Sequence, residues 1–336
     1  MGTYSGQWTD DKRNGIGTRI LPNGVCYSGK WHDNQPHGLG ALTPAGEPDD
    51  ARSWRYEGEW MYGNMHGQGS WACDGCTYIG SFVRDQFHGV GTYTQSDGMR
   101  YEGEWICGNM HGQGSWTWDG NTYVGAFKDD EFHGVGIYTQ LDGMRYEGEW
   151  KQDARHGHGI ESYINKSRYK GEWRDNMRNG VGTFMWVDGS HYRGEWKYNN
   201  RHGRGIESCV SGRRYDGEWQ HDAAHGVGMV TWVDNSRYTG EWQNDKRHGR
   251  GSKIYPDGSR YEGEWQADLP HGVGTLTWAD GSRYTGEWRD DLPHSVGTYI
   301  DPIGVTILCS WYDGRQHGSG TITARRHGAK AGKPLL

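Results

Sequence analysis

The sequence predicts an all-β protein made of one thin layer of short antiparallel strands. Two observations support this prediction. The pattern Tyr-x-Gly-x-Trp recurs at intervals of mostly 22 or 23 residues, and only 42 of 336 residues are Leu, Ile, Val or Phe. Because 57 Gly, 19 Trp and 21 Tyr accompany so few aliphatic residues, we expect aromatic rings packed over glycine rather than a thick aliphatic core.

The recurring pattern divides the chain into fourteen units. Each unit has one anchor residue, and the anchors are Tyr4, Tyr27, Tyr56, Tyr78, Tyr101, Tyr123, Tyr146, Tyr169, Tyr192, Tyr215, Tyr238, Tyr261, Tyr284 and Ile307. The spacing falls to 22 before Tyr78 and Tyr123 and rises to 29 before Tyr56. The longer interval predicts an insert at 43–53.

Each unit is expected to form two strands. Tyr, Gly and Trp at positions i, i+2 and i+4 share one face of a strand, and residues 112–118 alternate in the same way. Asp-Gly pairs between units, as at Asp97-Gly98, predict two-residue type I′ turns. His-Gly-x-Gly, as at 88–91, is placed in a polar loop before the second strand.

The face opposite the rings is expected to be charged. Glu recurs one residue before Trp, as at Glu104, and Arg recurs one residue before Tyr, as at Arg100. Both positions fall on the same face of a strand, so we expect Arg and Glu to pair with each other across the strands. This ladder would be solvated and would discourage aggregation.

Taken together, Tyr-x-Gly-x-Trp, Asp-Gly and His-Gly-x-Gly resemble the MORN repeat family over residues 4–320. The resemblance implies an elongated, twisted, solenoid-like rod of tandem β-hairpins in a single open sheet with a groove. Outside the repeats only a short basic C-terminal tail, 321–336, is expected, which favours the MORN-only type over arms fused to an enzyme. The groove is expected on the ring face, and it would bind protein through Tyr101, Trp105, Tyr146, Trp150, Tyr169, Trp173, Tyr192 and Trp196.

Three features depart from the repeat. Asn14 and Asn179 replace the recurring His, and Ser295 replaces a Gly. The last unit carries Ile307, Cys309 and Trp311 where the other units carry Tyr, Gly and an aromatic residue. Terminal units of repeat arrays are often atypical. These three residues are therefore expected to form a cap, or an edge for self-association into a homodimer.

Catalytic chemistry is not expected. Twelve of the 17 His occupy one repeated position, which indicates a structural role. Cys73 and Cys76 form a Cys-x-x-Cys without the second ligand pair that zinc sites use, so no metal and no cofactor are predicted. The Gly-x-Gly pairs lack the features of a phosphate loop. The charge balance, −7 overall, does not favour nucleic-acid binding.

The function that these observations favour is a non-enzymatic scaffold that binds protein. With the resemblance, they predict a cytoplasmic, cytoskeletal component, particularly of a cilium, flagellum or axoneme. A phosphoinositide-binding membrane–cytoskeleton linker and a regulatory arm for a partner enzyme, such as a lipid kinase, are the alternatives. Six Cys without regular spacing and without an export signal predict reduced thiols in the cytosol. Because Glu and Arg are evenly matched, protein is favoured over lipid as the partner.

Overall fold

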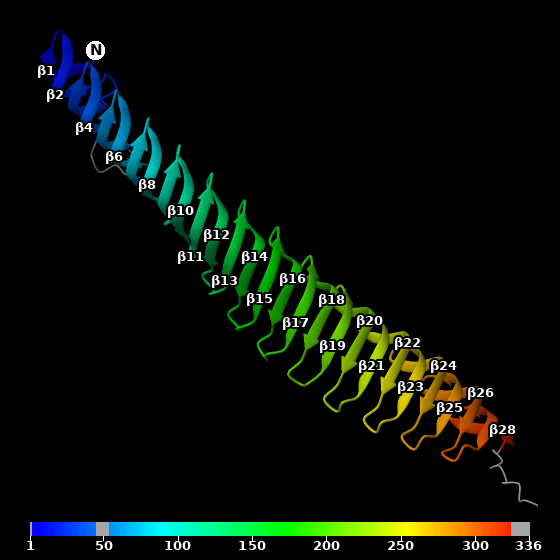
Figure 1. Cartoon of the computed structure of the whole chain (residues 1–336). Coiled ribbons are helices and arrows are strands. Elements are labelled where there is room, and N and C mark those ends of the chain that lie inside the picture. The colour runs from blue at the N-terminus through cyan, green and yellow to red at the C-terminus, as the bar shows by residue number, and fades with distance from the viewer. Residues whose placement is uncertain (1, 45–53, 324–336) are drawn as a thin grey trace, which may run out of the picture. The chain divides into compact units, whose positions relative to one another are not determined.

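The structure is a computed structural model, which describes residues 2–44 and 54–323. Within these residues every regular element is a β-strand, and none is a helix (Figure 1). Consequently, no helix in this part of the chain could cross a membrane. Apart from residues 43–44, the insert expected at 43–53 lies outside the described residues. So does the expected tail at 321–336, apart from residues 321–323.

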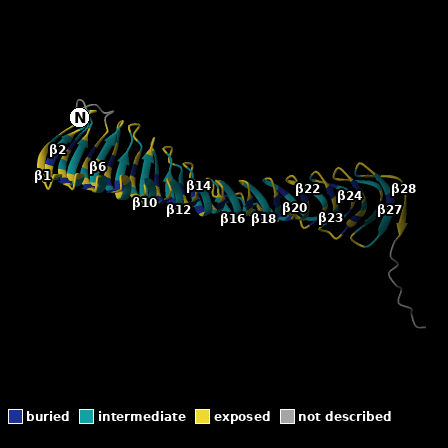
Figure 2. Cartoon of the chain, turned by 90° about the horizontal axis from the view of Figure 1, so that it is seen from above, coloured by how far each residue is buried: buried dark blue, intermediate teal, exposed yellow. Residues whose placement is uncertain are grey.

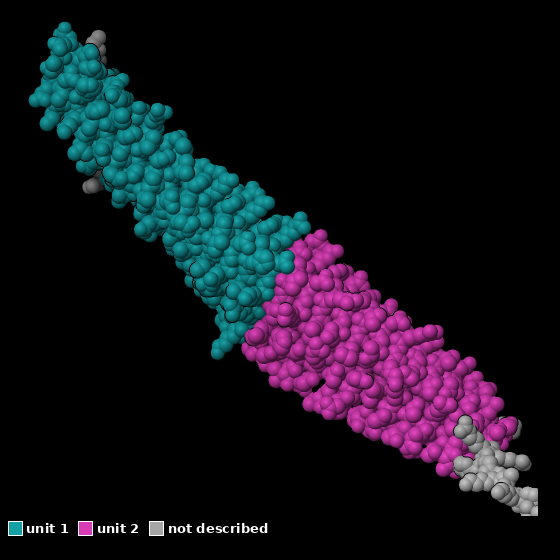
Figure 3. Space-filling view, viewed as in Figure 1, with its two compact units in different colours: residues 1–176 teal, residues 177–336 magenta. Residues whose placement is uncertain are grey.

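The strands fall into two compact units, residues 1–176 and 177–336 (Figure 3). The first unit contains β1 (Thr3–Thr9), β2 (Lys12–Ile20), β3 (Cys26–His32), β4 (Gln35–Thr43), β5 (Arg55–Met61), β6 (Asn64–Cys73), β7 (Cys76–Val83), β8 (Gln86–Thr94), β9 (Arg100–Ile106), β10 (Asn109–Trp118), β11 (Asn121–Lys128), β12 (Glu131–Thr139), β13 (Arg145–Lys151), β14 (Ala154–Ser162) and β15 (Arg168–Arg174). The second contains β16 (Met177–Met185), β17 (His191–Lys197), β18 (Asn200–Ser208), β19 (Arg214–Gln220), β20 (Ala223–Thr231), β21 (Arg237–Gln243), β22 (Lys246–Ile254), β23 (Arg260–Gln266), β24 (Leu269–Thr277), β25 (Arg283–Arg289), β26 (Leu292–Ile300), β27 (Thr306–Tyr312) and β28 (Arg315–Thr323).

Inside each of the two compact units every strand pairs antiparallel with the strand that follows it in sequence, as β11 does with β12 and β12 with β13. Within the described residues the sheet stays open, because β1 pairs only with β2 and β28 only with β27. Two strands make one sequence repeat, a Tyr-x-Gly-x-Trp strand followed by a His-Gly-x-Gly strand. The predicted fold class, all-β with tandem hairpins in a single-layer antiparallel sheet, is confirmed.

Between most repeats the predicted two-residue type I′ turn is replaced by a longer loop. At Asp97-Gly98 only Gly98 has positive φ, +92°, and the Gly98 N–H donates to the Gln95 carbonyl at 3.0 Å. The loop therefore has three residues with a left-handed glycine at its end. Two consecutive positive φ values occur inside each repeat instead, as at Asp129 (+51°) and Asp130 (+70°). Asp and Asn tolerate this left-handed conformation better than other side chains, which the sequence analysis did not use.

A two-residue turn between repeats also explains the two shorter repeat intervals. Before Tyr78 and Tyr123 the connection between repeats is itself a two-residue turn, with φ of +50° and +78° at Asp74 and Gly75. Such a loop is one residue shorter than the three-residue loop, so the spacing drops from 23 to 22.

The recurring His lies in a strand and not in a loop. In β10, His111 is opposite Glu104 and Gly114 is opposite Gly103, so two extra residues bulge out of the strand between them. Gly112, at φ +59°, supplies the left-handed residue of this β-bulge. The expectation of a polar loop at His-Gly-x-Gly is therefore wrong. The bulge permits a strand of nine or ten residues to continue past it.

The predicted Arg–Glu ladder is also wrong in its pairing. In four repeats the Arg before Tyr pairs with the acidic residue two positions later on its own strand, as Arg100 does with Glu102 at 2.5 Å. The Glu before Trp accepts a hydrogen bond from the backbone at the bulge, as Glu104 Oε1 does from the Gln113 N–H at 2.9 Å. The exposed N–H of the bulge attracts this carboxylate, because bulge formation leaves it without a strand partner.

The core of the sheet is a layer of Tyr and Trp rings. From the second repeat to the thirteenth, the Tyr and the Trp or Phe of the first strand are buried, whereas the connecting loops are exposed (Figure 2). Each Tyr ring lies over a pair of facing glycines: a Cβ at Gly114 would meet the Oη of Tyr101 at 2.5 Å. Glycine is thus required where the ring crosses the neighbouring strand, as the aromatic-on-glycine prediction states.

Candidate binding surface

Two hydrogen bonds fix the buried rings in most repeats, as at Tyr101 and Trp105. The Tyr101 hydroxyl donates to the Glu104 carbonyl at 2.9 Å, on its own strand. The Trp105 Nε1 donates to the Gly91 carbonyl of the preceding repeat at 3.2 Å. The Trp105 ring also packs edge-on against the Tyr101 ring, with centroids 5.0 Å apart. A buried indole N–H needs such a partner, so Trp both fills the layer and joins it to the previous repeat.

A second set of aromatic rings lies on the same face but is only partly buried. They come from the His-Gly-x-Gly strands and the residues just after them, which position them over the buried layer. The half-buried rings include Trp71, Phe87, Tyr93, Trp116, Phe132 and Tyr138 in residues 1–176, and Phe184, Trp186, Trp232, Tyr255, Trp278 and Tyr299 in residues 177–336. This set, called here the outer rings, is what the ring face offers to a partner.

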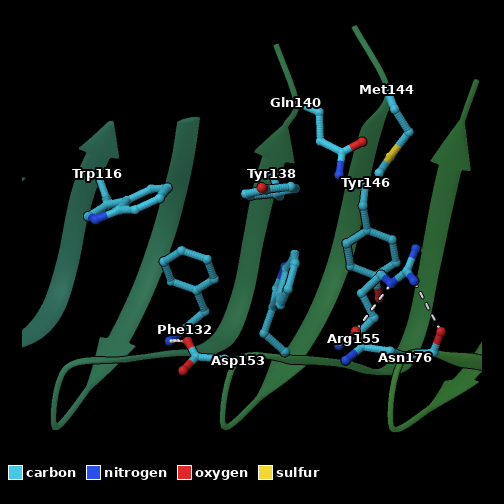
Figure 4. A pocket seen from close by; sticks show the side chains of 10 residues that line it. Trp116, Phe132, Tyr138, Gln140, Met144, Tyr146, Asp153, Arg155 and Asn176 are labelled. Carbon is cyan, nitrogen blue, oxygen red and sulfur yellow. Dashed lines mark hydrogen bonds between the residues drawn. The ribbon is translucent and has the colours of Figure 1, made fainter. Parts of the chain in front are cut away.

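The outer rings enclose a pocket of about 290 Å³ in residues 1–176 (Figure 4). Its lining comprises Trp116, Phe132, Tyr138, Gln140, Met144, Tyr146, Trp150, Asp153, Arg155 and Asn176. Trp116 packs against Phe132 with centroids 5.6 Å apart, and Tyr138 lies 6.0 Å from Trp150. The pocket is therefore walled by ring faces from β10, β12 and β13.

Arg155 forms the charged wall of this pocket and is held on several sides. Its Nε donates to Oδ1 of Asn176 at 3.3 Å, and its guanidinium lies 4.4 Å from the Trp173 ring centroid. It also forms an ion pair with Glu161, which is 5% exposed and accepts a hydrogen bond from the Tyr163 hydroxyl. A buried carboxylate is tolerated because these partners satisfy it. These contacts hold the Arg155 side chain in one conformation.

An Asp or Asn side chain at the end of a two-residue turn closes the lower side of the pocket. Asp153 Oδ1 accepts from the Phe132 N–H at 2.7 Å, and the Asn176 side-chain oxygen accepts from the Arg155 N–H at 2.9 Å (Figure 4). Each bond connects one repeat to the preceding repeat. The pocket walls are therefore held by the same contacts that hold the sheet.

The phenols of the layer serve as hydrogen-bond donors. Burial raises the pKa of Tyr78 to about 12, and burial together with a hydrogen bond to Cys76 raises the pKa of Tyr93 to about 12. Burial likewise raises the pKa of Tyr123 and Tyr146. The charged form of a phenol is disfavoured away from water, so these groups stay neutral near pH 7.

The polar face carries shallow hollows of a different kind. In residues 177–336 one of about 500 Å³ is lined by Glu195, His202, Glu218 and His225 among others, and another of the same size recurs around Glu241, His248, Glu264 and His271. Within the described residues no three His, Cys, Asp or Glu are grouped to hold a metal ion. All six cysteines, Cys73 and Cys76 included, are free thiols.

The residues predicted to line the groove are all in the buried layer. Tyr101, Trp105, Tyr146, Trp150, Tyr169, Trp173, Tyr192 and Trp196 are 0–7% exposed. Of these, Tyr146 and Trp150 reach the pocket, where they form part of its floor. The outer rings were missed as binding residues, although alternation in segments such as 112–118 places them on the same face. A protein-binding role stays a prediction for both sets.

The residues predicted as a self-association edge are not at an edge. Ile307, Cys309 and Trp311 lie on β27, which pairs with β26 on one side and β28 on the other. Cys309 is 7% exposed, and the Trp311 ring packs 5.1 Å from the Tyr284 ring. The sequence predicted two strands in this last unit as in the others, and the edge belongs to the second of them, β28, not to the strand that carries these three residues.

A single layer of hairpins, each joined to the preceding one through Trp–Gly and Tyr–Gly contacts, defines a β-repeat protein. The MORN repeat matches the chain fourteen times, at residues 4–26, 27–43, 56–77, 78–100, 101–122, 123–145, 146–168, 169–191, 192–212, 215–237, 238–260, 261–283, 284–306 and 310–325. The chain belongs to the MORN repeat family. Proteins of this repeat type act as scaffolds.

No curated protein sequence matches the chain. Among solved structures, the TCP10 domain of Danio rerio CPAP in complex with a peptide of Danio rerio STIL is 13% identical, with a TM-score of 0.34, over 68% of this chain and 96% of that chain. The TCP domain of Drosophila melanogaster SAS-4 (dCPAP), in complex with a proline-rich motif of Ana2 (dSTIL), is 12% identical, with a TM-score of 0.30, over 46% of this chain and 84% of that chain. Similarity at this level does not transfer function.

Proposed function

We propose that this MORN-repeat chain is a non-enzymatic scaffold that binds a protein partner along its outer rings. The observation that carries the proposal is the pocket between Trp116 and Tyr138. Half-buried rings around a preformed hollow offer large contact area at little cost in side-chain freedom. An extended peptide, or a helix laid across the strands, can place an apolar side chain in this hollow and hydrogen-bond to the Gln140 amide.

The location that we propose is the cytoplasm, within a cytoskeletal assembly such as a cilium or flagellum. Its support is the extent of the MORN repeat, which offers many equivalent positions for partners. Localising the tagged protein in cells tests this part. Staining that never coincides with microtubule or axonemal markers contradicts it.

The pocket is tested by proximity labelling in cells with matched variants. Tyr138→Ala removes one wall of the pocket. Val135→Ala is the control, because Val135 lies on the same strand, is 67% exposed and faces the polar side. Partners labelled by the natural chain should be lost with Tyr138→Ala and kept with Val135→Ala. Equal labelling by all three proteins rules out the pocket as the binding site.

Protein is proposed over lipid on the basis of charge. Four of the eight recurring surface Arg residues are paired with acidic residues on their own strands, as in Arg214–Asp216 at 2.9 Å and Arg145–Glu147 at 2.8 Å. Binding to anionic lipid requires roughly four to eight unpaired basic residues in one region. Flotation with phosphoinositide-containing vesicles at physiological salt should therefore fail. Strong flotation that persists after removal of residues 324–336 favours the membrane-linker alternative.

A further inference from the structure

The two terminal strands each present half of an interface that occurs repeatedly inside the chain. At every internal junction, a Tyr-x-Gly-x-Trp strand docks on the His-Gly-x-Gly strand of the preceding repeat. The junction of β24 with β25 shows the pattern. Trp288 Nε1 donates to the Gly274 carbonyl at 3.1 Å, and the Trp288 ring packs 5.2 Å from the Tyr261 ring.

Strand β1 carries the first half without a partner. Trp8 occupies the position of Trp288, and its ring touches Tyr4 of its own strand at 5.1 Å. Trp8 is nevertheless 59% exposed, whereas Trp31 at the next position of the repeat is 4% exposed. The difference arises because Trp31 donates to Gly17 at 2.9 Å, while no strand precedes β1 within the described residues.

Strand β28 carries the second half. It retains His-Gly-x-Gly at 317–320, with Gly318 in the left-handed conformation at φ +77°. Among the strands that the structure describes, β28 pairs only with β27. Ile322 is 69% exposed, although Val230 at the equivalent position of β20 is 0% exposed because the next strand covers it.

The two halves match residue for residue. At the β24–β25 junction the facing pairs are Gly272↔Trp288, Gly274↔Gly286, Thr275↔Thr285 and Leu276↔Tyr284. Applied to β28 and β1, the same register gives Gly318↔Trp8, Gly320↔Gly6, Thr321↔Ser5 and Ile322↔Tyr4. The glycines required beneath the rings are present on both strands. Thr or Ser occupies both sides of the pair in which Thr275 and Thr285 hydrogen-bond at 2.9 Å.

The turn that follows β1 supplies a third matching contact. At internal junctions the second turn residue, for example Asp245, accepts a hydrogen bond from the backbone of the preceding repeat, here from the Ala224 N–H at 2.7 Å. The equivalent residues at the free ends are Asp11 and Gln316. Asp11 has the same left-handed φ, +59°, as Asp245, +64°. Gln316, unlike Pro270 and Pro293 at the same position, has an N–H to donate.

We propose that β1 of one copy pairs antiparallel with β28 of a second copy, so that the array continues from one molecule into the next. The occupant is a second copy because this chain itself carries both complementary strands. The interface joins two different surfaces, so it leaves one free β1 and one free β28 on every pair. Such an interface adds further copies and forms open chains of molecules instead of stopping at a dimer.

Directed cross-linking of the full-length chain tests the register. Ser5→Cys and Thr321→Cys variants are mixed and mildly oxidised, and the linked peptides are identified by mass spectrometry, which separates them from links through the native cysteines. The 5–321 link should form in the mixture. The control mixes Ser5→Cys with Thr298→Cys, because Thr298 is equivalent to Thr321 on β26, a strand paired on both sides. A 5–321 link no more abundant than the 5–298 link overturns the proposal, as does a dominant 5–5 link.

Sedimentation velocity tests the open-ended assembly. The mass of the natural chain should rise with concentration beyond that of a dimer. Trp8→Ala removes one half of the interface and leaves β28 intact, so this variant should remain monomeric alone. Added in small amounts to the natural chain, it should bind free β1 ends through its intact β28 and shorten the assemblies. A monomeric natural chain at every concentration, a mass that stops at the dimer, or no shortening by Trp8→Ala overturns the proposal.

Discussion

The carboxylate of Glu104 accepts a hydrogen bond from the backbone N–H of Gln113 at 2.9 Å, across the β-bulge formed at Gly112. The side chain of Glu104 lies against Gly112 closely enough that a Cβ there would be 2.5 Å from its carboxylate carbon. Similar bonds join Glu149 to the His158 N–H at 2.8 Å and Glu241 to the Arg250 N–H at 2.9 Å. In these repeats an acidic residue thus caps the irregular point of the following strand.

Glu104→Ala should therefore loosen the bulge in β10. The Gln113 N–H would lose a charge-assisted partner, and we expect a loss of about 1 kcal/mol in the local free energy of opening. Amide hydrogen exchange at Gln113 measures this directly. Glu104→Gln should restore most of the protection, since the amide oxygen still accepts.

Glu102→Ala is the matched control, because the exposed ion pair of Glu102 with Arg100 contributes at most about 1 kcal/mol and does not involve the bulge. Exchange at Gln113 should not change in this variant. Equal acceleration by Glu102→Ala and Glu104→Ala would show that surface charge, and not the cap, protects the bulge.

Trp196→Ala should destabilise the second unit locally. Trp196 is 5% exposed and its Nε1 donates to the Gly182 carbonyl at 3.2 Å. The variant therefore loses a buried ring and leaves the Gly182 carbonyl without this donor. We expect a cost of about 3–5 kcal/mol. Because contacts in a repeat array are between neighbours, exchange should accelerate in β16 to β19 far more than in β24 to β26.

Met185→Ala serves as its control, since Met185 lies on β16 and is 49% exposed. Its effect should stay within about 0.5 kcal/mol. Uniform loss of protection throughout the chain after Trp196→Ala would contradict a nearest-neighbour array.

Gly205→Ala should disturb the ring layer despite adding a single methyl group. A Cβ at Gly205 would lie 2.2 Å from the Tyr192 Oη and 2.4 Å from its Cζ, so the ring would have to leave its position over the strand. Such overpacking typically costs about 1–3 kcal/mol. Thermal unfolding followed by near-UV circular dichroism reports it. Arg204→Ala, an exposed change on the same strand, should leave the midpoint nearly unaltered.

Alkaline pH should unfold the protein through its tyrosines. Burial raises the pKa of Tyr78 and of Tyr284 to about 12, above the value of about 10 for an unfolded chain. The unfolded state therefore loses these protons first. The buried neutral phenols therefore contribute fully to the free energy of unfolding below a pH of about 10. This contribution is lost as the pH rises towards about 12.

Tyrosinate absorbance and circular dichroism, recorded in one titration, test this. Most of the absorbance should develop together with loss of the β-sheet signal, in contrast to the gradual titration of the chain in denaturant. Ionisation of nearly all tyrosines while the sheet signal is intact would mean that the rings are accessible to solvent.

The sequence alone determined the repeat and its local structure. Tyr101, Gly103 and Trp105 share one strand face because side chains alternate, and so few aliphatic residues leave rings and glycine as the only material for a core. These patterns are local, with a period of two, so all-β hairpins and the buried ring layer could be predicted. The family resemblance followed from the same residues.

The tertiary structure decided which groups meet across strands. Glu104 and Arg100 lie on one face, but the β-bulge brings the Gln113 N–H to Glu104 and leaves Arg100 to Glu102. The type I′ turns at positions such as Asp129-Asp130 depend on how two strands close, not on the Asp-Gly signal. The accessible rings, among them Trp116 and Tyr138, were separated from the buried ones only by strand packing. The open edge falls on β28, because β28 follows the strand that carries Trp311 and pairs with it. An edge strand is recognised by the backbone groups that it leaves unpaired.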